Sequence, residues 1–211
     1  MSGEIVSAKI DRYLAGLRRT DDAVLAAMER EADLRGFPIV GPLVGRLLLT
    51  LALASGARRV LELGSGYGYS TYWFATAVGD GGLVIHTDFD ADNSRQAAAY
   101  LTRAGLGRRV RFETGDALDV LRKEAGMFDI IFCDIDKEAY PEVPALALPK
   151  LRQRGLLIFD NALWSGRVTT GRGADPATAA IRRLNTELAA REDLVTTILP
   201  LRDGVSVSVK R

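Results

Sequence analysis

The chain has 211 residues, 47% of them apolar, and its 28 basic and 27 acidic residues leave a formal net charge of +1. This length and composition suit one well-filled globular domain, expected to span residues 1–211. The balanced charge excludes a chain-wide electrostatic footprint for nucleic acid or an anionic membrane. The longest apolar stretch, 47–54, is far shorter than the roughly 20 residues that a membrane span requires.

The start of the chain and its cysteine content indicate a compartment. The first residues, MSGEIVSAKIDRYL, carry acids and helical spacing and do not resemble a secretory signal. The single cysteine, Cys133, cannot form an internal disulfide, which fits a reducing environment. Within FDIIFCD it is expected to be a buried strand thiol rather than a nucleophile. We therefore expect a cytoplasmic protein.

Helices are predicted before the first strand. Their ranges are 4–18, 21–35 and 42–55. Apolar residues recur in them at helical spacing, and Thr20 or Asp21 is the predicted N-cap of the second helix. We expect this segment, residues 1–56, to cover the sheet, to wall a pocket or to form an oligomer surface.

Strands and helices alternate in the rest of the chain. Strands are predicted at 59–63, 83–87, 109–114, 128–133, 155–159, 194–199 and 204–210, and helices at 69–78, 92–104, 116–124, 141–152 and 176–191. This alternation predicts an α/β fold with a doubly wound, mostly parallel seven-stranded sheet and helices on both faces. Residues 200–204 are too short for a crossover, so the last two strands should be antiparallel neighbours. The polar segment 165–175 is predicted to be a mobile loop.

A glycine-rich turn, ELGSGYG (62–68), follows the first predicted strand and opens a helix. A dinucleotide fingerprint that starts at Gly64 needs a small residue where Tyr69 stands, and one that starts at Gly66 needs it at Thr71, so both frames fail. The spacing E-x-G-x-G-x-G instead resembles the first motif of the class I S-adenosylmethionine-dependent methyltransferases. The alternative is a tight strand-to-helix turn that happens to be rich in glycine.

Acidic residues follow the next two strands. Asp88 ends the second strand, about where such folds place a carboxylate that accepts hydrogen bonds from ribose hydroxyls. Asp90 and Asp92 are nearby competitors, although Asp92 is better interpreted as the N-cap of the following helix. Asp116 follows the third strand, where it would either face an adenine amino group or cap a helix.

Asp134 and the pair Asp160-Asn161 each follow an apolar run, FDIIFC and GLLIF. Because the carboxyl ends of parallel strands meet at one edge of a sheet, these residues can converge. Two carboxylates and an amide oxygen are hard donors that suit Mg²⁺, Ca²⁺ or Mn²⁺. The alternative is that the Asp-Asn pair only turns the chain.

Six segments together resemble the cation-dependent O-methyltransferase family that includes caffeoyl-CoA and catechol O-methyltransferases: ELGSGYGYST, HTDFD, FETGDALDVL, FDIIFCDIDKEAY, GLLIFDNALWSGRV and LRDGVSVSVKR. This resemblance implies that Asp134, Asp160 and Asn161 are metal ligands and that Lys137 is the general base. It also implies an S-adenosylmethionine site bordered by Glu62, Gly64, Ser65, Gly66, Ser70, Asp88, Asp116, Ala117 and Asp134.

The implied reaction is methyl transfer from S-adenosylmethionine to a hydroxyl of a catechol-like or other hydroxylated small molecule, in a homodimer. A divalent cation would orient and acidify that hydroxyl. Lys137, with an ordinary pKa of about 10.4, then needs the cation and desolvation to lose its proton near neutral pH. The alternative for Lys137 is a solvated or ion-paired lysine.

Two further functions stay open. One is O-methylation of hydroxylated uridine in transfer RNA, for which a phosphate-binding rim is expected from Arg152, Arg154, Arg167 and Arg172. The other is a non-catalytic S-adenosylmethionine-binding protein.

Overall fold

The computed structural model describes residues 7–17, 22–169 and 175–211. The first helices in this part of the chain are α1 (Ala8–Gly16), α2 (Ala23–Arg35) and α3 (Gly41–Ala54). The strands are β1 (Arg59–Leu63), β2 (Leu83–Asp88), β3 (Val110–Thr114), β4 (Phe128–Cys133), β5 (Leu151–Phe159), β6 (Leu194–Leu199) and β7 (Val205–Lys210). The other α-helices are α4 (Tyr69–Val78), α5 (Ala91–Arg103), α6 (Ala117–Lys123), α7 (Val143–Ala147) and α8 (Pro176–Ala190). The 3-10 helices are η1 (Gly107–Arg109), η2 (Lys137–Glu142), η3 (Leu148–Lys150) and η4 (Trp164–Thr169).

Within the described residues, seven strands form one sheet in the order β3-β2-β1-β4-β5-β7-β6. Strands β1 to β5 pair in parallel, whereas β7 is antiparallel to both β5 and β6. The predicted fold class and the antiparallel pairing of the last two strands are therefore confirmed. The sequence did not predict that β7 lies between β5 and β6, because either strand of a hairpin can be the one that pairs with the rest of the sheet.

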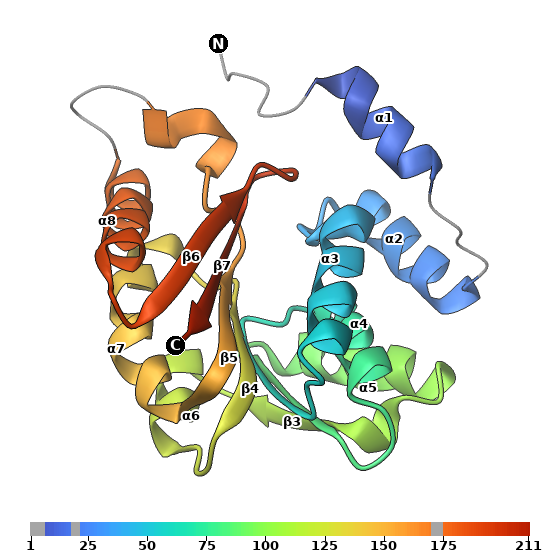
Figure 1. The fold of residues 1–211 in the computed structure, drawn as a ribbon. Helices are drawn as coiled ribbons and strands as arrows, with labels where there is room; N and C mark the ends of the chain where they lie inside the picture. The colour runs from blue at the N-terminus through green and yellow to red at the C-terminus, as the bar shows by residue number, and fades with distance from the viewer. Residues whose placement is uncertain (1–6, 18–21, 170–174) are drawn as a thin grey trace.

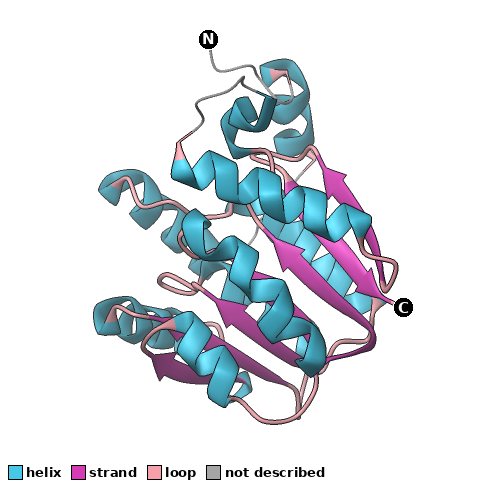
Figure 2. Ribbon diagram, turned by 90° about the vertical axis from the view of Figure 1, so that its left-hand side faces the viewer, coloured by secondary structure: helices cyan, strands magenta, loops and turns pink. Residues whose placement is uncertain are grey.

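Helices cover both faces of the sheet. On one face, α2, α3, α4 and α5 pack against strand side chains such as Val60 and Ile130. On the other face, α6, α7 and α8 pack against side chains such as Leu61 and Ile131. Burial on both faces explains why the parallel strands are nearly continuous apolar runs in the sequence. Figure 1 shows the two helical layers on either side of the sheet, and Figure 2 shows helices crossing in front of the strands.

Short polar side chains begin several helices, because their oxygens accept hydrogen bonds from the amides of the first turn. The capping residues are Ser7, Asp22, Asp90, Asp116 and Asp175. The predicted caps of α2, Thr20 and Asp21, lie outside the described residues, and Asp22 fills that role. The prediction that Asp92 caps α5 is wrong, because the backbone amide of Asp92 donates to the carboxylate of Asp90.

The predicted helix at 141–152 is also wrong. The segments η2, α7 and η3 take its place, and β5 begins at Leu151 instead of residue 155. Pro141, Pro144 and Pro149 explain the difference, since proline lacks an amide hydrogen and clashes with the preceding turn of an α-helix. The predicted loop 165–175 begins inside η4, and residues 170–174 lie outside the described part of the chain.

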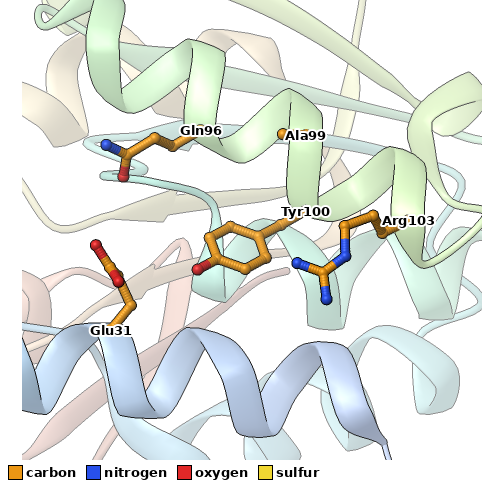
Figure 3. Close-up of a pocket in the computed structure, with 5 residues that line it drawn as sticks. All are labelled: Glu31, Gln96, Ala99, Tyr100 and Arg103. Atoms are coloured by element: carbon orange, nitrogen blue, oxygen red, sulfur yellow. The ribbon is translucent and has the colours of Figure 1, made fainter.

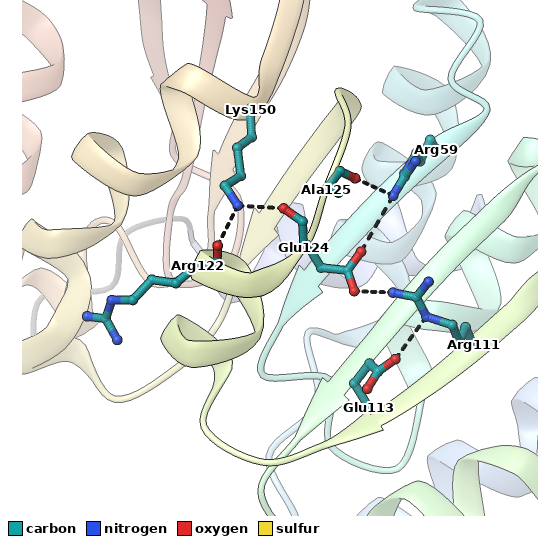
Figure 4. Close-up of polar contacts among 7 residues, drawn as sticks. All are labelled: Arg59, Arg111, Glu113, Arg122, Glu124, Ala125 and Lys150. Carbon is teal, nitrogen blue, oxygen red and sulfur yellow. Dashed lines mark hydrogen bonds and ion pairs between the residues drawn. The ribbon is translucent and has the colours of Figure 1, made fainter.

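Charged side chains join elements at the amino ends of the strands (Figure 4). Glu124, just after α6, forms ion pairs with Arg59 of β1 and Arg111 of β3. Lys150 donates to the carbonyl oxygens of Arg122 and Glu124 at 2.9 and 2.6 Å. These contacts lie away from the strand ends that carry the predicted site residues. No helix in the described ranges has the length and apolar character needed to cross a membrane.

Candidate active site

The carboxyl ends of β1, β4 and β5 bring the predicted metal-binding carboxylates together. Cys133 and Phe159 are partners in the register of β4 and β5, so Asp134 and Asp160 leave neighbouring strands side by side. The amide of Asp160 donates to Cys133 O at 3.1 Å, and that of Asp134 donates to Leu63 O at 2.8 Å. Backbone hydrogen bonds thus hold both aspartates at the edge where ligands collect in parallel sheets.

The glycine-rich turn after β1 packs against the same edge. Gly64 has a φ of 80°, and a Cβ atom there would lie 2.8 Å from the carbonyl carbon of Asp134 and still closer to its oxygen. Only glycine combines this left-handed backbone with so close an approach to β4. The turn leads into α4, whose N-cap is Gly68.

Side chains of β2 hold Gly66 at both of its backbone polar groups. Asp88 Oδ2 accepts a hydrogen bond from Gly66 N at 2.9 Å, and His86 Nε2 lies 3.0 Å from Gly66 O. Since a carbonyl oxygen only accepts, Nε2 must carry the proton. Burial lowers the pKa of His86 and favours the neutral ring. His86 therefore anchors the turn.

The carboxylate of Asp88 organises the end of β2. Besides Gly66, it accepts hydrogen bonds from Asp90 N at 2.9 Å and from Asn93 Nδ2 at 3.1 Å. Phe89, the next residue, is 84% exposed although it is a large apolar side chain. Phe89 was not among the site residues predicted from the sequence. Its signal was a large aromatic residue directly after a strand-end carboxylate.

Asp116 and Ala117 lie next to β2 because the amide of Gly115 donates to Asp88 O at 3.0 Å. Asp116 Oδ1 accepts a hydrogen bond from Asp119 N at 2.9 Å. Asp116 thus caps α6, which is one of the two roles predicted for it from the sequence. Ala117 is buried in the first turn of that helix. One carboxylate oxygen of Asp116 is thus used by the fold.

Glu62 of β1 has no exposed surface. Its Oε2 accepts a hydrogen bond from the hydroxyl of Thr71, and the hydroxyls of Ser70 and Ser65 also favour its charged form. Its Oε1 has no hydrogen-bond partner among the described residues. Burial, together with the charge of Asp134, outweighs the hydroxyls and raises the pKa of Glu62 to about 7. A cationic partner would hold this acid in its ionised form.

Glu62→Gln should remove a pH-dependent loss of stability. The folded chain keeps the Glu62 proton up to about pH 7, whereas the ordinary pKa is 4.5. Because the folded state binds more protons between these values, the contribution of Glu62 to the free energy of unfolding falls as the pH rises from about 4.5 through about 7, by up to roughly 3 kcal/mol. Glutamine keeps an acceptor for Thr71 but does not titrate.

Urea unfolding of the wild type and Glu62→Gln at pH 5 and pH 8, without added cofactor, measures this effect. The stability of the wild type relative to the variant should be lower at pH 8 than at pH 5. An equal difference at the two pH values would mean that Glu62 does not carry the shift.

Asp160 is 5% exposed. Burial and the charge of Asp134 raise its pKa to about 7, against the opposing effects of the Asn161 amide, Lys137 and Arg202. Two carboxylates therefore lie close enough to disfavour the ionisation of one of them. A cation held by these carboxylates would reverse that effect.

The ammonium group of Lys137 is enclosed beside Asp134. Its Nζ donates to Asp134 Oδ1 at 2.7 Å, to Ile135 O at 3.0 Å and to Tyr140 Oη at 2.9 Å. Tyr140 is buried and in turn donates to Asp160 O at 3.0 Å. Burial raises the pKa of Tyr140 well above its ordinary value. These contacts use all three N–H bonds of the protonated amine, so the structure has Lys137 in the ion-paired state.

The amide of Asn161 comes from the loop after β5. Asn161 has a φ of 56°, a conformation that asparagine tolerates better than most residues. Its Nδ2 donates to Asp203 Oδ2 at 3.1 Å, which leaves the amide oxygen as the end suited to a cation. Among the described residues, no three His, Cys, Asp or Glu side chains are grouped to hold a metal. A cation here would depend on two carboxylates and this amide.

Trp164 lies next to the lysine. The centre of its ring system is 5.9 Å from Lys137 Nζ and 4.9 Å from the guanidinium carbon of Arg167. Its indole nitrogen is buried without a hydrogen-bond partner in the described part of the chain. The ring of Trp164 therefore lies within cation–π distance of two cationic side chains.

A separate surface pocket of about 220 Å³ lies between α2 and α5. Figure 3 shows the hydroxyl end of Tyr100 directed from α5 toward Glu31 of α2, with Arg103 beside the ring. The other residues that line the pocket, Gln96 and Ala99, also belong to α5. None of the predicted site residues lines this pocket, so it is distinct from the site at the strand ends.

The three arginines of the predicted phosphate-binding rim that the structure describes do not lie together. Arg152 and Arg154 belong to the first half of β5, where Arg152 is paired with Asp129. Arg167 is in η4, after the opposite end of that strand. Arg172 lies outside the described residues. Arg152 and Arg154 are thus separated from Arg167 by the length of the strand.

Known proteins resemble this chain over most of its length. Residues 7–211 match the family described as O-methyltransferase. A catechol O-methyltransferase of Niastella koreensis is 35% identical over 212 residues, which cover 95% of this chain and 96% of the relative. A putative O-methyltransferase of Mycolicibacterium smegmatis is 32% identical over 90% of this chain and 92% of its own.

Solved structures share the fold over nearly the whole chain. The O-methyltransferase TomG from Streptomyces achromogenes, in complex with SAM, has a TM-score of 0.86, 29% identity and coverage of 96% of both chains. The O-methyltransferase from Bacillus cereus, in complex with SAH, has a TM-score of 0.87 and 30% identity, and the match covers 96% of this chain and 97% of that one. The strand ends, the glycine-rich turn and these matches lead to one conclusion: the chain belongs to the O-methyltransferase family.

Proposed function

We propose that the protein transfers the methyl group of S-adenosylmethionine to a hydroxyl of a catechol-like or other hydroxylated small molecule, with a divalent cation at the acceptor. The observation that carries this proposal is the meeting of the glycine-rich turn with Asp134, Asp160 and Lys137 at one edge of the sheet. The Niastella koreensis relative and the SAM- and SAH-bound neighbours support the same reaction class.

The residues around the turn fit S-adenosylmethionine. The methionine part of this molecule carries an ammonium group, and Glu62 has a buried carboxylate oxygen without a partner among the described residues. Asp88 Oδ2 keeps one lone pair for a ribose hydroxyl beyond the one that Gly66 N uses. Phe89 presents an exposed aromatic face on which adenine would stack. The lack of side chains at Gly64 and Gly66 lets a ligand lie close to the backbone.

Asp134, Asp160 and Asn161 would hold the cation. Their oxygen donors suit Mg²⁺, Mn²⁺ or Ca²⁺, and Asp160 is buried at the end of the strand next to the one that Asp134 follows. Such a cation, when bound, lowers the pKa of an acceptor hydroxyl and stabilises the resulting negative charge.

The chain's own residues would then orient the acceptor and remove its proton. Lys137 has to lose one proton before Nζ can accept another, and the neutral amine keeps two N–H bonds, enough for Ile135 O and Tyr140 Oη. Trp164 provides a flat wall next to this nitrogen. Alignment of the acceptor oxygen with the methyl group supplies much of the rate enhancement that such a site can give.

The test is methyl transfer from labelled S-adenosylmethionine to a panel of catechols and matched monophenols, with Mg²⁺ or with EDTA. Turnover should require Mg²⁺ and favour catechols. Asp160→Ala should lower it at least about 100-fold, because several kcal/mol of charge stabilisation is lost. Asp193→Ala is the matched control. Asp193 is paired with Arg191 just before β6, whose first residue lies at the end of the sheet opposite to Asp160.

The outcomes separate the parts of the proposal. Full activity in EDTA would reject the cation. Binding of S-adenosylmethionine without turnover of any catechol would favour another acceptor, and transfer RNA in low and high salt would be assayed next. Failure to bind S-adenosylmethionine at all would reject the proposal.

A further inference from the structure

The turn between β6 and β7 is bonded to the loop that carries Asn161. The amide of Ala162 donates to Gly204 O at 2.8 Å, and the amide of Leu163 donates to Asp203 O at 2.9 Å. Gly204 has a φ of 85°, and a Cβ atom there would lie 2.8 Å from Leu163 N. The two segments, 161–165 and 203–204, are therefore joined backbone to backbone. Figure 1 shows this turn and η4 at the same end of the sheet.

Both carboxylate oxygens of Asp203 face this loop. Oδ2 accepts from Asn161 Nδ2 at 3.1 Å, and Oδ1 accepts from the backbone amide of Ser165. Asp203 thereby holds the loop at its first and last residues. The backbone of Asn161 has a left-handed conformation, and its side-chain amide can still rotate. The hydrogen bond to Asp203 restricts this rotation.

The two ends of an asparagine amide differ chemically. The oxygen can ligate a cation, whereas the NH₂ group is a donor and would point two hydrogens at it. A carboxylate next to the amide selects between the two orientations, because it attracts the NH₂ group and repels the oxygen.

We propose that Asp203 is a positioning residue that turns the oxygen of Asn161 toward the cation site. This inference rests on the proposed cation at Asp134, Asp160 and Asn161, and adds to it a residue from a different element of the fold. Groups that orient metal ligands in this way typically account for about 10- to 100-fold in metal affinity.

Asp203→Asn isolates the orientation from the packing. The variant side chain has the same shape and keeps an acceptor oxygen for Ser165 N, but its NH₂ group can donate to Asn161 and stabilise the reversed amide. Mn²⁺ binding to the full chain, followed by the electron paramagnetic resonance signal of the free ion, should weaken about 10- to 100-fold. The urea midpoint and the dissociation constant for S-adenosylmethionine should stay close to those of the wild type.

A second pair of variants distinguishes orientation from a general loosening of the loop. Asn161→Asp makes both ends of this side chain oxygen, so it has no wrong orientation, although it brings a second carboxylate next to Asp203. In that background, Asp203→Asn should strengthen Mn²⁺ binding, since it replaces a repulsion by a hydrogen bond. A purely structural role of Asp203 would weaken binding in both backgrounds.

Asn185 provides the matched control, because its Nδ2 donates to Ala162 O at 2.8 Å and anchors the same loop without touching the amide of Asn161. Asn185→Ala should leave Mn²⁺ affinity within about twofold of the wild type. Equal Mn²⁺ affinity of the wild type and Asp203→Asn would overturn the role of Asp203 alone. Absence of Mn²⁺ binding by the wild type would overturn the cation site and, with it, the positioning role.

Discussion

Lys137→Met should lower kcat by roughly 10²- to 10⁴-fold, the range over which a positioned general base contributes. Methionine nearly keeps the length of the side chain but has no proton to exchange. The fall should appear in kcat, with the dissociation constant for S-adenosylmethionine little changed, because Lys137 contacts Asp134, Ile135 and Tyr140 and not the glycine-rich turn. Single-turnover methyl transfer at saturating cofactor, acceptor and Mg²⁺ measures the chemical step directly.

Lys137→Arg separates proton transfer from charge. Arginine keeps a cation beside Asp134 but does not lose its proton in proteins. If Lys137 is the base, both variants should be slow, while the arginine variant keeps more of the stability that the ion pair provides. Near-normal kcat in Lys137→Arg would mean that the lysine acts only through its charge, as the ion pair in the structure would allow.

Gly64→Ala should destabilise the protein by roughly 2–5 kcal/mol, with two causes that add. A left-handed backbone costs a residue with a Cβ atom about 1–2 kcal/mol, and the forced contact with the backbone of Asp134 costs about 1–3 kcal/mol more. The variant should also lose affinity for S-adenosylmethionine, since either the turn or β4 has to move. Urea unfolding and equilibrium binding of the cofactor measure the two effects.

Gly105→Ala is the control that contains only the first cause. Gly105 has a φ of 72°, close to that of Gly64, but a Cβ atom there would meet no other atom within 4 Å. Its cost should be about 1–2 kcal/mol, and cofactor binding should be unchanged. Equal losses of stability at Gly64 and Gly105 would show that the approach to Asp134 relaxes without cost.

The strands and the glycine-rich turn were predictable because each is encoded locally. Buried parallel strands are short apolar runs, and the residues that follow them, such as Asp88, Asp134 and Asp160, reach one edge of the sheet by topology alone. The predicted helix at 141–152 was wrong because three prolines interrupt a segment whose apolar residues have helical spacing. The predicted N-cap of α5 was wrong by two residues, because the sequence does not distinguish Asp90 from Asp92 as the capping acceptor.

The contacts that complete the site depend on distant pairs of side chains. Asn161 and Asp203 are 42 positions apart and meet only because β7 lies next to β5. Similarly, the motif around Lys137 contains Tyr140, but its spacing did not show that the phenol would bridge the lysine to the backbone of Asp160. Such pairings require the strand order, which periodicity and spacing do not provide.

The position of β7 has a consequence for biosynthesis. Because β7 lies between β5 and β6, the ribosome makes β6 before the strand that joins it to the rest of the sheet. Until residues 205–210 emerge, β5 is an open edge with the apolar sequence Leu156 to Phe159, the kind of edge that pairs readily with other chains. The nascent chain therefore exposes an edge that can pair wrongly until β7 is in place.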